Sequence, residues 1–426
     1  MPLPMQKLRC LHTSDWHLGA MFHEQPRDAD EQRALDALVD LARDELVDAV
    51  LIAGDVFDGV NPPAAAQERW YRTLHRLRHE AGVGCVLAIG GNHDHGLRLD
   101  APRGFLAPAQ VHLRGHLPLD RAADEVVVPV TARDGRIAAW AALVPYLREG
   151  DVSLAELGTA EVDCATRHAE GLEARYTAIQ QALAQRAGSL PRLVLAHAFA
   201  AGGTVGSSER PVLGERAVGR LSLCRIDALA AGCAYVALGH LHRPQRVGGH
   251  DHWRYCGSLL PMAMDEATTP RQVLVVDVDQ DGAQTQVRAS TLPGQRTYAR
   301  ITGDPAAVLA AIAALPQTTG DALAGWCDLT VAARTVDPGL VRELQDRVAA
   351  RGWLALAVRR ALDPDAGATM WSDSATDGAD GDGPTLDQIT PTAVFEAVVR
   401  AQGVEPDAEL AADFANLLAD VQQAGV

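Results

Sequence analysis

Side chains that commonly bind metal ions follow five apolar runs of this 426-residue sequence. Each run has the pattern of a β-strand, and the polar residues come directly after it. In chain order the candidates are Asp15 and His17 in LHTSDWHLG, Asp55 and Asp58 in LIAGDVFD, Asn92, His93 and Asp94 in IGGNHDHG, His197 in LVLAHAF, and His240 and His242 in ALGHLH. These residue types predict the binding of divalent metal ions.

The donor atoms indicate which metals and how many. Carboxylate, amide oxygen and neutral imidazole suit manganese, iron or zinc, and none of the five segments contains cysteine. If seven of the ten candidates are ligands, they are too many for one tetrahedral site. Seven ligands suit two metals about 3.5 to 4 Å apart that share a carboxylate. A single Asp-x-His or His-x-His is a weak signal, whereas five such segments in order, four of them flanked by glycine, are a strong one.

The elements that must position these residues alternate between strands and helices over residues 7–275. Because loops at the carboxyl ends of strands meet at one edge of an α/β sheet, the five segments are expected to form one cluster. Strands are predicted at residues 8–14, 49–54, 84–90, 136–144, 192–197 and 234–239, helices at 29–46, 63–80 and 166–187, and a hairpin with an Asp-Gly turn at 272–290.

The rest of the chain divides into three parts. Residues 297–361 read strand, helix, strand, helix, strand, and both helices open with Asp-Pro, a cap followed by proline at the first helical position. We therefore expect a layered α/β domain over residues 1–292 and a small second α/β domain over 297–361. Residues 363–384 have the composition of an acidic flexible linker, and residues 385–424 are expected to form two docking helices.

Composition excludes several classes of protein. No apolar run is long enough to span a bilayer, the N-terminus lacks the apolar core of a signal peptide, and the seven cysteines form no CxxC pair, so a reducing cytoplasm is expected. The net charge of −17 argues against a nucleic-acid partner at first sight. However, residues 361–426 hold thirteen acids and one base, Arg400, which leaves a net charge of only −5 on the remainder.

The five segments together resemble the calcineurin-like metallophosphoesterases in the pattern D-x-H, GD-x-x-D, GNHD, H and GHxH. With AGDVFD followed by Pro62 and Pro63, and with TLDQITPTAVFEAV near the C-terminus, the resemblance narrows to the SbcD family of bacterial nuclease subunits and covers essentially the whole chain. It implies a layered β-sandwich flanked by helices, with a small α/β capping domain and C-terminal helices.

The resemblance also implies roles for individual residues. Asp15, His17 and His242 would hold one divalent metal, Asn92, His197 and His240 would hold the other, and Asp55 would bridge them. His93 would reach the phosphate and protonate the leaving oxygen, with Asp94 orienting its ring. The metals implied are Mn²⁺ ions.

Several residues keep two interpretations. Asp58 stands where relatives outside bacteria have histidine, and capping of the helix after Pro63 is an equally good reading. His250 and His252 form a second D-x-H-like fragment, but they lie in a glycine-rich stretch suited to a turn and are left out of the site. The stripe of Trp70, Leu74 and Leu77, with Tyr71 beside it, is expected to pack on its own sheet. The resemblance implies instead that helices in this region contribute to a homodimer, and both interpretations can hold for different faces of the helix.

The resemblance implies a manganese-dependent DNA nuclease with 3′ to 5′ exonuclease activity on duplex ends and endonuclease activity on hairpins. It would act in recombination and repair at the nucleoid, as a homodimer within a heterotetramer with an SMC-like ATPase, SbcC. Residues 297–361 would contact DNA and residues 385–424 would bind SbcC. The alternatives are a stand-alone phosphoesterase for a nucleotide or small phosphodiester, and a catalytically silent scaffold, which the intact ligand set disfavours.

Overall fold

The computed structural model describes residues 7–117, 123–148, 151, 161–200, 226–267, 269–318, 322–333 and 337–361, together with Phe395 and Phe414. Side chains are described from residue 170 onward in the helix that begins at Glu161. The predicted linker at 363–384 lies outside these residues, as does all of the predicted helical segment at 385–424 except Phe395 and Phe414. None of the described helices is long and apolar enough to cross a membrane.

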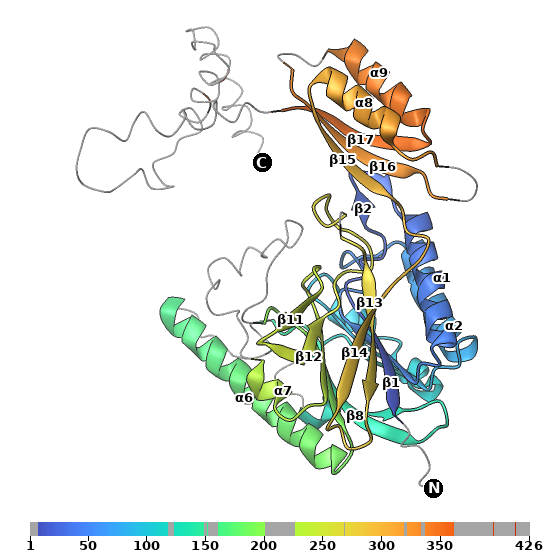
Figure 1. The fold of residues 1–426 in the computed structure, drawn as a ribbon. Helices are drawn as coiled ribbons and strands as arrows, with labels where there is room; N and C mark the ends of the chain where they lie inside the picture. The colour runs from blue at the N-terminus through green and yellow to red at the C-terminus, as the bar shows by residue number, and fades with distance from the viewer. Residues whose placement is uncertain are drawn as a thin grey trace, which may run out of the picture.

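Two six-stranded sheets form the body of the protein (Figure 1). The strand order in the first sheet is β14-β13-β1-β4-β5-β6, with bounds Thr285–Thr291, Gln272–Val278, Leu8–Thr13, Ala49–Ala53, Cys85–Ile89 and Val111–Arg114. The order in the second is β11-β12-β10-β9-β8-β7, with bounds Gln245–Val247, His250–Tyr255, Tyr235–Gly239, Arg192–His197, Ile137–Val144 and Val127–Thr131. Strands β1, β4, β5 and β6 run parallel, as do β8, β9, β10 and β12.

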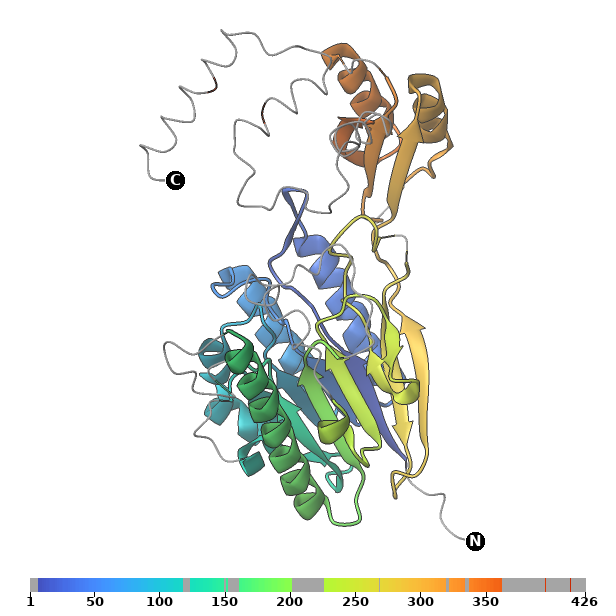
Figure 2. The same cartoon turned by 90° about the vertical axis from the view of Figure 1, so that its left-hand side faces the viewer.

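Helices cover the outer face of each sheet, so the body has four layers, which lie side by side in Figure 1 and one behind another in Figure 2. Helices α1 (Asp28–Asp44) and α2 (Ala64–His79) pack on the first sheet, and α6 (Glu161–Ala187) and α7 (Asp227–Ala230) pack on the second. Successive residues of a strand point to opposite faces, and β4 shows both faces buried. Val50 and Ile52 pack toward α1 and α2, whereas Ala49 and Leu51 pack against the second sheet.

Shorter elements complete the body of the protein. Their bounds are β2 Met21–Phe22, β3 Gln25–Pro26, α3 Gly96–Asp100, α4 Arg103–Leu106, and the 3-10 turns Ala107–Ala109 and Ala123–Val126.

The stripe of Trp70, Leu74 and Leu77 on α2 faces inward, because Trp70 is fully buried and packs edge-on against Trp16. Packing on its own sheet is therefore the correct interpretation of that stripe.

A separate three-stranded sheet follows, drawn in orange at the top of Figure 1. Strands β15 (Tyr298–Gly303), β16 (Gly325–Val331) and β17 (Trp353–Arg360) are parallel, and α8 (Pro305–Ala314) and α9 (Pro338–Ala349) pack on them around a core of their own. The predicted caps are confirmed: Asp304 accepts a hydrogen bond from the N–H of Ala307, and Asp337 accepts from Leu340. We call residues 297–361 the cap.

Among the described residues, an ion pair at Arg296, directly before the cap, and an apolar cluster hold the cap against the body. The guanidinium of Arg296 lies 2.8 Å from both carboxylate oxygens of the buried Asp30, and it stacks 3.9 Å from the ring centroid of Trp326. Trp326 also packs with Phe22 and Met264 of the body.

Candidate metal centre

All five predicted segments meet at one end of the two sheets. Asp15 and His17 follow β1, Asp55 and Asp58 follow β4, and Asn92 follows β5, all from the first sheet. His197 ends β9, and His240 and His242 follow β10, both from the second sheet. The parallel strands therefore place their carboxyl ends together, as expected from the sequence, and the site lies where the two sheets meet.

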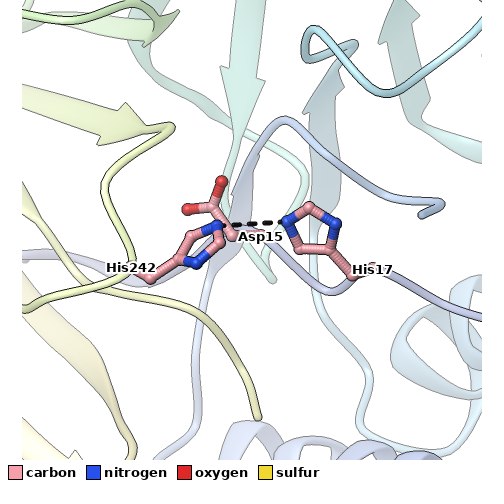
Figure 3. A group of neighbouring side chains, drawn as sticks. All are labelled: Asp15, His17 and His242. Atoms are coloured by element: carbon pink, nitrogen blue, oxygen red, sulfur yellow. Dashed lines mark hydrogen bonds between the residues drawn. The ribbon is translucent and has the colours of Figure 1, made fainter. Parts of the chain in front are cut away.

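Asp15, His17 and His242 form a first group, shown in Figure 3. Their ligand atoms lie within 4.8 Å of one another, and Nε2 of His17 is 3.3 Å from Nε2 of His242. The other ring nitrogens have carboxylate partners: Nδ1 of His17 lies 3.2 Å from Asp58, and Nδ1 of His242 lies 3.4 Å from Glu266. Since a carboxylate only accepts, both Nδ1 atoms donate, and when the two rings are neutral, the Nε2 atoms that face each other carry lone pairs.

Asn92, His197 and His240 form a second group. The side-chain oxygen of Asn92 lies 3.0 Å from Nε2 of His197 and 3.0 Å from Nδ1 of His240. Nδ1 of His197 donates to the carbonyl of Ala53 at 2.9 Å, which leaves its Nε2 without a proton when the ring is neutral. The three side chains thus direct ligand atoms at a common point.

Asp55 lies between the two groups. Its Oδ2 is 3.6 Å from Nε2 of His17 and 3.4 Å from Nε2 of His197, while its Oδ1 accepts the N–H of His93 at 2.9 Å. One carboxylate oxygen is therefore fixed by the backbone and the other faces a histidine from each group. This is the placement that a ligand shared by two cations requires.

The electrostatics favour positive charge at this point. Burial alone would lower the pKa of His197, but the charge and hydrogen bond of Asp55 outweigh it and raise that pKa to about 9. Burial acts against ionisation of Asp55 too, yet His197, His17 and His93 hold its pKa well below the usual range. A buried cluster in which carboxylates and imidazole nitrogens converge fits divalent cations.

The backbone is strained at the same residues. Asp15, His17, Asp55 and His240 have φ values of 51°, 45°, 47° and 105°, which non-glycine residues rarely adopt. Hydrogen bonds hold these conformations: the N–H groups of Asp15 and His17 donate to the carbonyls of Gly54 and Asp55, each at 3.0 Å. Strain of this kind persists where the surrounding structure fixes the residue, and it concentrates at functional sites.

Glycines next to the predicted ligands allow the two sheets to approach each other closely. Gly54 has a φ of +95°, and a Cβ added there would lie 2.1 Å from Nδ1 of His197. A Cβ added at Gly239 would lie 1.8 Å from the carbonyl oxygen of Ala53. The loop after β4 and the ends of β9 and β10 can meet only because these side chains are absent.

His93 lies beside the first group, with its ring edge-on to His17 at a centroid distance of 4.8 Å. Its Nδ1 donates to the main-chain carbonyl of Asp58 at 2.9 Å, so its Nε2 is the nitrogen left for a substrate. The expectation that Asp94 orients this ring is corrected. The Asp94 carboxylate instead accepts main-chain N–H groups of Val56, Phe57 and Gly91, which joins the loops after β4 and β5.

Two other sequence interpretations change. Asp58 does not cap α2, because the cap residue is Pro63 and the Asp58 carboxylate contacts His17. His250 and His252 lie on strand β12, and the turn occurs before them at Gly248 and Gly249.

Glu266, which contacts His242, was not predicted from the sequence. It sits in the sequence MAMDEATT, which has neither a strand-like run before it nor ligand-type spacing to mark it.

Known proteins provide an independent comparison. The family model for calcineurin-like phosphoesterases matches residues 8–244. The chain is 35% identical over 285 residues to the D subunit of the nuclease SbcCD from Rhodobacter capsulatus, covering 64% of this chain and 66% of that one. It is 32% identical over 311 residues to the Escherichia coli K12 protein of the same name (71% and 73%), and 33% identical over 276 residues to that of Bacillus subtilis 168 (63% and 66%).

The matches thus span about two thirds of the Rhodobacter and Bacillus relatives and nearly three quarters of the E. coli one. The chain is a member of the calcineurin-like phosphoesterases, a family of divalent-metal enzymes, and within that family it belongs with the SbcD-type nuclease subunits.

Proposed function

We propose that this chain is the nuclease subunit of an SbcCD-type complex and hydrolyses DNA phosphodiester bonds with two divalent metals. The observation that carries the proposal is the position of Asp55 Oδ2 between Nε2 of His17 and Nε2 of His197, 3.6 and 3.4 Å away. One ligand set would be Asp15, His17 and His242, the other Asn92, His197 and His240, with Asp55 shared. Mn²⁺ fits the mixed oxygen and nitrogen donors.

When bound, the two cations supply neutralisation of phosphate charge and activation of a water for in-line attack. The chain's own residues do the rest. Asp58 keeps Nδ1 of His17 protonated, so that Nε2 of His17 faces the cluster. His93, with Nδ1–H fixed on the carbonyl of Asp58, presents Nε2 to the leaving oxygen. In its imidazolium form it would donate the Nε2 proton to that oxygen and be left as the neutral Nδ1–H ring.

The substrate and partner follow from the similarity to the SbcD-type relatives. We expect 3′ to 5′ exonuclease activity on duplex ends and endonuclease activity on hairpins, in recombination and repair at the nucleoid. The cap, residues 297–361, would contact DNA, and residues 385–424 would bind the SMC-like ATPase, SbcC. The rings of Phe395 and Phe414, the two described residues of that segment, stack at 4.0 Å between centroids.

A homodimer within the heterotetramer is supported by one apolar surface. Helices α2 and α4 border a pocket of about 460 Å³ whose lining includes Tyr71, Pro102, Phe105 and Leu106. Phe105 is 88% exposed and Tyr71 is 40% exposed. Large apolar side chains gathered around a pocket are typical of protein interfaces.

The test is digestion of an end-labelled DNA hairpin by the purified chain in Mn²⁺, with and without SbcC and ATP. His93→Ala should abolish cleavage while leaving the fold intact. His95→Ala is the matched control, because His95 is an exposed histidine of the same loop that caps α3. Stimulation by SbcC and ATP would support the complex. An intact hairpin under every condition, together with hydrolysis of a small phosphodiester, would favour a stand-alone phosphoesterase.

A further inference from the structure

A buried glutamate contacts the predicted metal ligand His242. Glu266 lies in the segment between β12 and β13 and is 1% exposed. Its Oε1 accepts from Nδ1 of His242 at 3.4 Å, and its Oε2 accepts the N–H of Met262 at 3.0 Å. Both carboxylate oxygens are therefore occupied by donors whose positions the fold fixes.

The buried guanidinium of Arg271 holds the glutamate and the histidine together. Its Nη1 lies 3.5 Å from Oε2 of Glu266 and 3.0 Å from the carbonyl oxygen of His242, and its Nη2 donates to the main-chain carbonyl of Glu266. A charge of −1 on Glu266 is thus balanced without a contribution from His242. The histidine ring can stay neutral while its Nδ1–H is held.

Contacts with other parts of the chain also hold the segment that contains Glu266. The carbonyl of Pro261 accepts from Arg27 at 2.7 Å, and Met264 packs with Phe22 and with Trp326 of the cap. These contacts fix the main chain on both sides of residue 262, whose N–H binds the glutamate. Glu266 is therefore held rigidly enough to determine the orientation of a neighbouring ring.

We propose that Glu266 is a positioning residue that sets the tautomer and orientation of His242, so that its bare Nε2 faces Nε2 of His17 at 3.3 Å. The proposal rests on the proposed function, in which His242 binds a metal. Partners of this kind fix the tautomer of a ligating histidine and increase its basicity, and their loss weakens metal binding by about 10- to 100-fold.

Glu266→Gln tests the proposal sharply because it keeps the shape of the side chain. Three donors surround the carboxylate: Nδ1–H of His242, the N–H of Met262, and Arg271. An amide has one oxygen and one NH₂ group, so it cannot accept on both sides. With the oxygen toward Met262 and Arg271, the NH₂ group faces Nδ1 of His242, and the ring must move its proton to Nε2.

The measurement is Mn²⁺ binding to the full chain by titration calorimetry. Glu266→Gln should weaken one binding step by about 10- to 100-fold. Asp328→Asn is the control: it makes the same acid-to-amide change at a buried residue paired with an arginine, Arg359, inside the cap. It should bind Mn²⁺ like the unaltered chain.

A second readout needs no metal. Spectra of ¹⁵N-histidine in the metal-free chain should show His242 protonated at Nδ1, and Glu266→Gln should move that proton to Nε2. The signal is assigned by its loss in His242→Gln. Glu266→Asp keeps the charge but moves the carboxylate away from His242, so its Mn²⁺ affinity should lie between those of the unaltered chain and Glu266→Gln. This variant also provides a test if Glu266→Gln folds poorly.

Unchanged Mn²⁺ affinity and an unchanged tautomer in folded Glu266→Gln or Glu266→Asp would overturn the proposal. A loss of affinity equal in Asp328→Asn would overturn it too, because the effect would then be a general loss of stability. If the unaltered chain binds no Mn²⁺, the proposed function fails instead, and the tautomer in the metal-free chain still decides the role of Glu266.

Discussion

Asp58 accepts a hydrogen bond from Nδ1 of His17 at 3.2 Å. Burial acts against its ionisation, but this hydrogen bond and the nearby His17 and His93 lower the pKa of the Asp58 carboxyl group. The aspartate therefore remains a charged acceptor at neutral pH and keeps the His17 proton on Nδ1. It has this role without being one of the seven predicted ligands.

Asp58→Ala should weaken Mn²⁺ binding by about 10- to 100-fold and reduce cleavage at low Mn²⁺, with partial recovery in excess Mn²⁺. The physical reason is that His17 loses the group that fixes its tautomer. Cleavage rate measured against Mn²⁺ concentration checks this. Asp134→Ala is the control, since Asp134 is a similarly exposed acid paired with Arg136 on a distant turn. Equal Mn²⁺ dependence in both variants would contradict the role assigned to Asp58.

Gly54→Ala should reduce the free energy of unfolding by about 2 to 5 kcal/mol, because it combines a disfavoured positive φ with a clash against His197. Gly135→Ala isolates the backbone effect, since Gly135 has a φ of +84° with open space around it. It should lose about 1 to 2 kcal/mol. Urea denaturation of both variants gives the comparison, and equal losses would show that the sheets tolerate a methyl group between them.

Acid should destabilise the fold through His12, which joins the two sheets by a 2.8 Å hydrogen bond between its Nδ1 and the Tyr235 hydroxyl. Burial lowers the pKa of His12 to about 3. The unfolded chain binds a proton below about pH 6.5, whereas the folded chain does so only near pH 3, so the free energy of unfolding falls as pH decreases between these values.

From pH 7 to pH 5 this one group should account for about 2 kcal/mol. His12→Gln retains a polar partner for Tyr235 and does not titrate. The decrease in unfolding free energy between pH 7 and pH 5 should therefore be about 2 kcal/mol smaller in the variant than in the unaltered chain. Urea denaturation at the two pH values measures it, and parallel losses in both proteins would refute the role of His12.

Arg296→Met should loosen the cap, because it leaves the buried carboxylate of Asp30 without its partner and removes the cation that stacks on Trp326. Loss of one member of a buried ion pair costs about 3 to 5 kcal/mol. Limited proteolysis should cut the connection between β14 and β15 faster than in the unaltered chain. Arg300→Met, at an exposed position of β15, should not change the cleavage rate. Equal rates of proteolysis in the unaltered chain, Arg296→Met and Arg300→Met would show that the ion pair does not hold the cap against the body.

The sequence predicts most of this architecture because its strands are apolar runs that end in polar residues. Strands β1, β4, β5, β9 and β10 lie where expected to within one residue or so at each end, and their carboxyl ends converge as parallel strands must. Short or polar strands were missed: Val111–Arg114 has two basic or imidazole side chains, and His250–Tyr255 resembles a turn because only its last residues are apolar.

The contacts that orient the site could not be predicted for a different reason. Asp58 and Asp94 are both acids in the expected segments, and only the three-dimensional path of the loops shows that Asp58 reaches an imidazole while Asp94 binds main-chain N–H groups. Glu266 lies 24 residues from His242 along the chain. Local sequence patterns contain no information about a pairing of that length.

The division of the ligands between the two sheets has a consequence for the life of the protein in the cell. Strands β1, β4 and β5 belong to one sheet and β9 and β10 to the other, so each of the two proposed ligand sets takes residues from both sheets, and neither sheet alone would bind the cations. Separation of the sheets would release the metal, and metal at 100 times its dissociation constant would oppose that separation by about 2.7 kcal/mol. A cell short of metal would therefore hold a chain that is both inactive and more exposed to proteases, so its abundance would follow the metal supply.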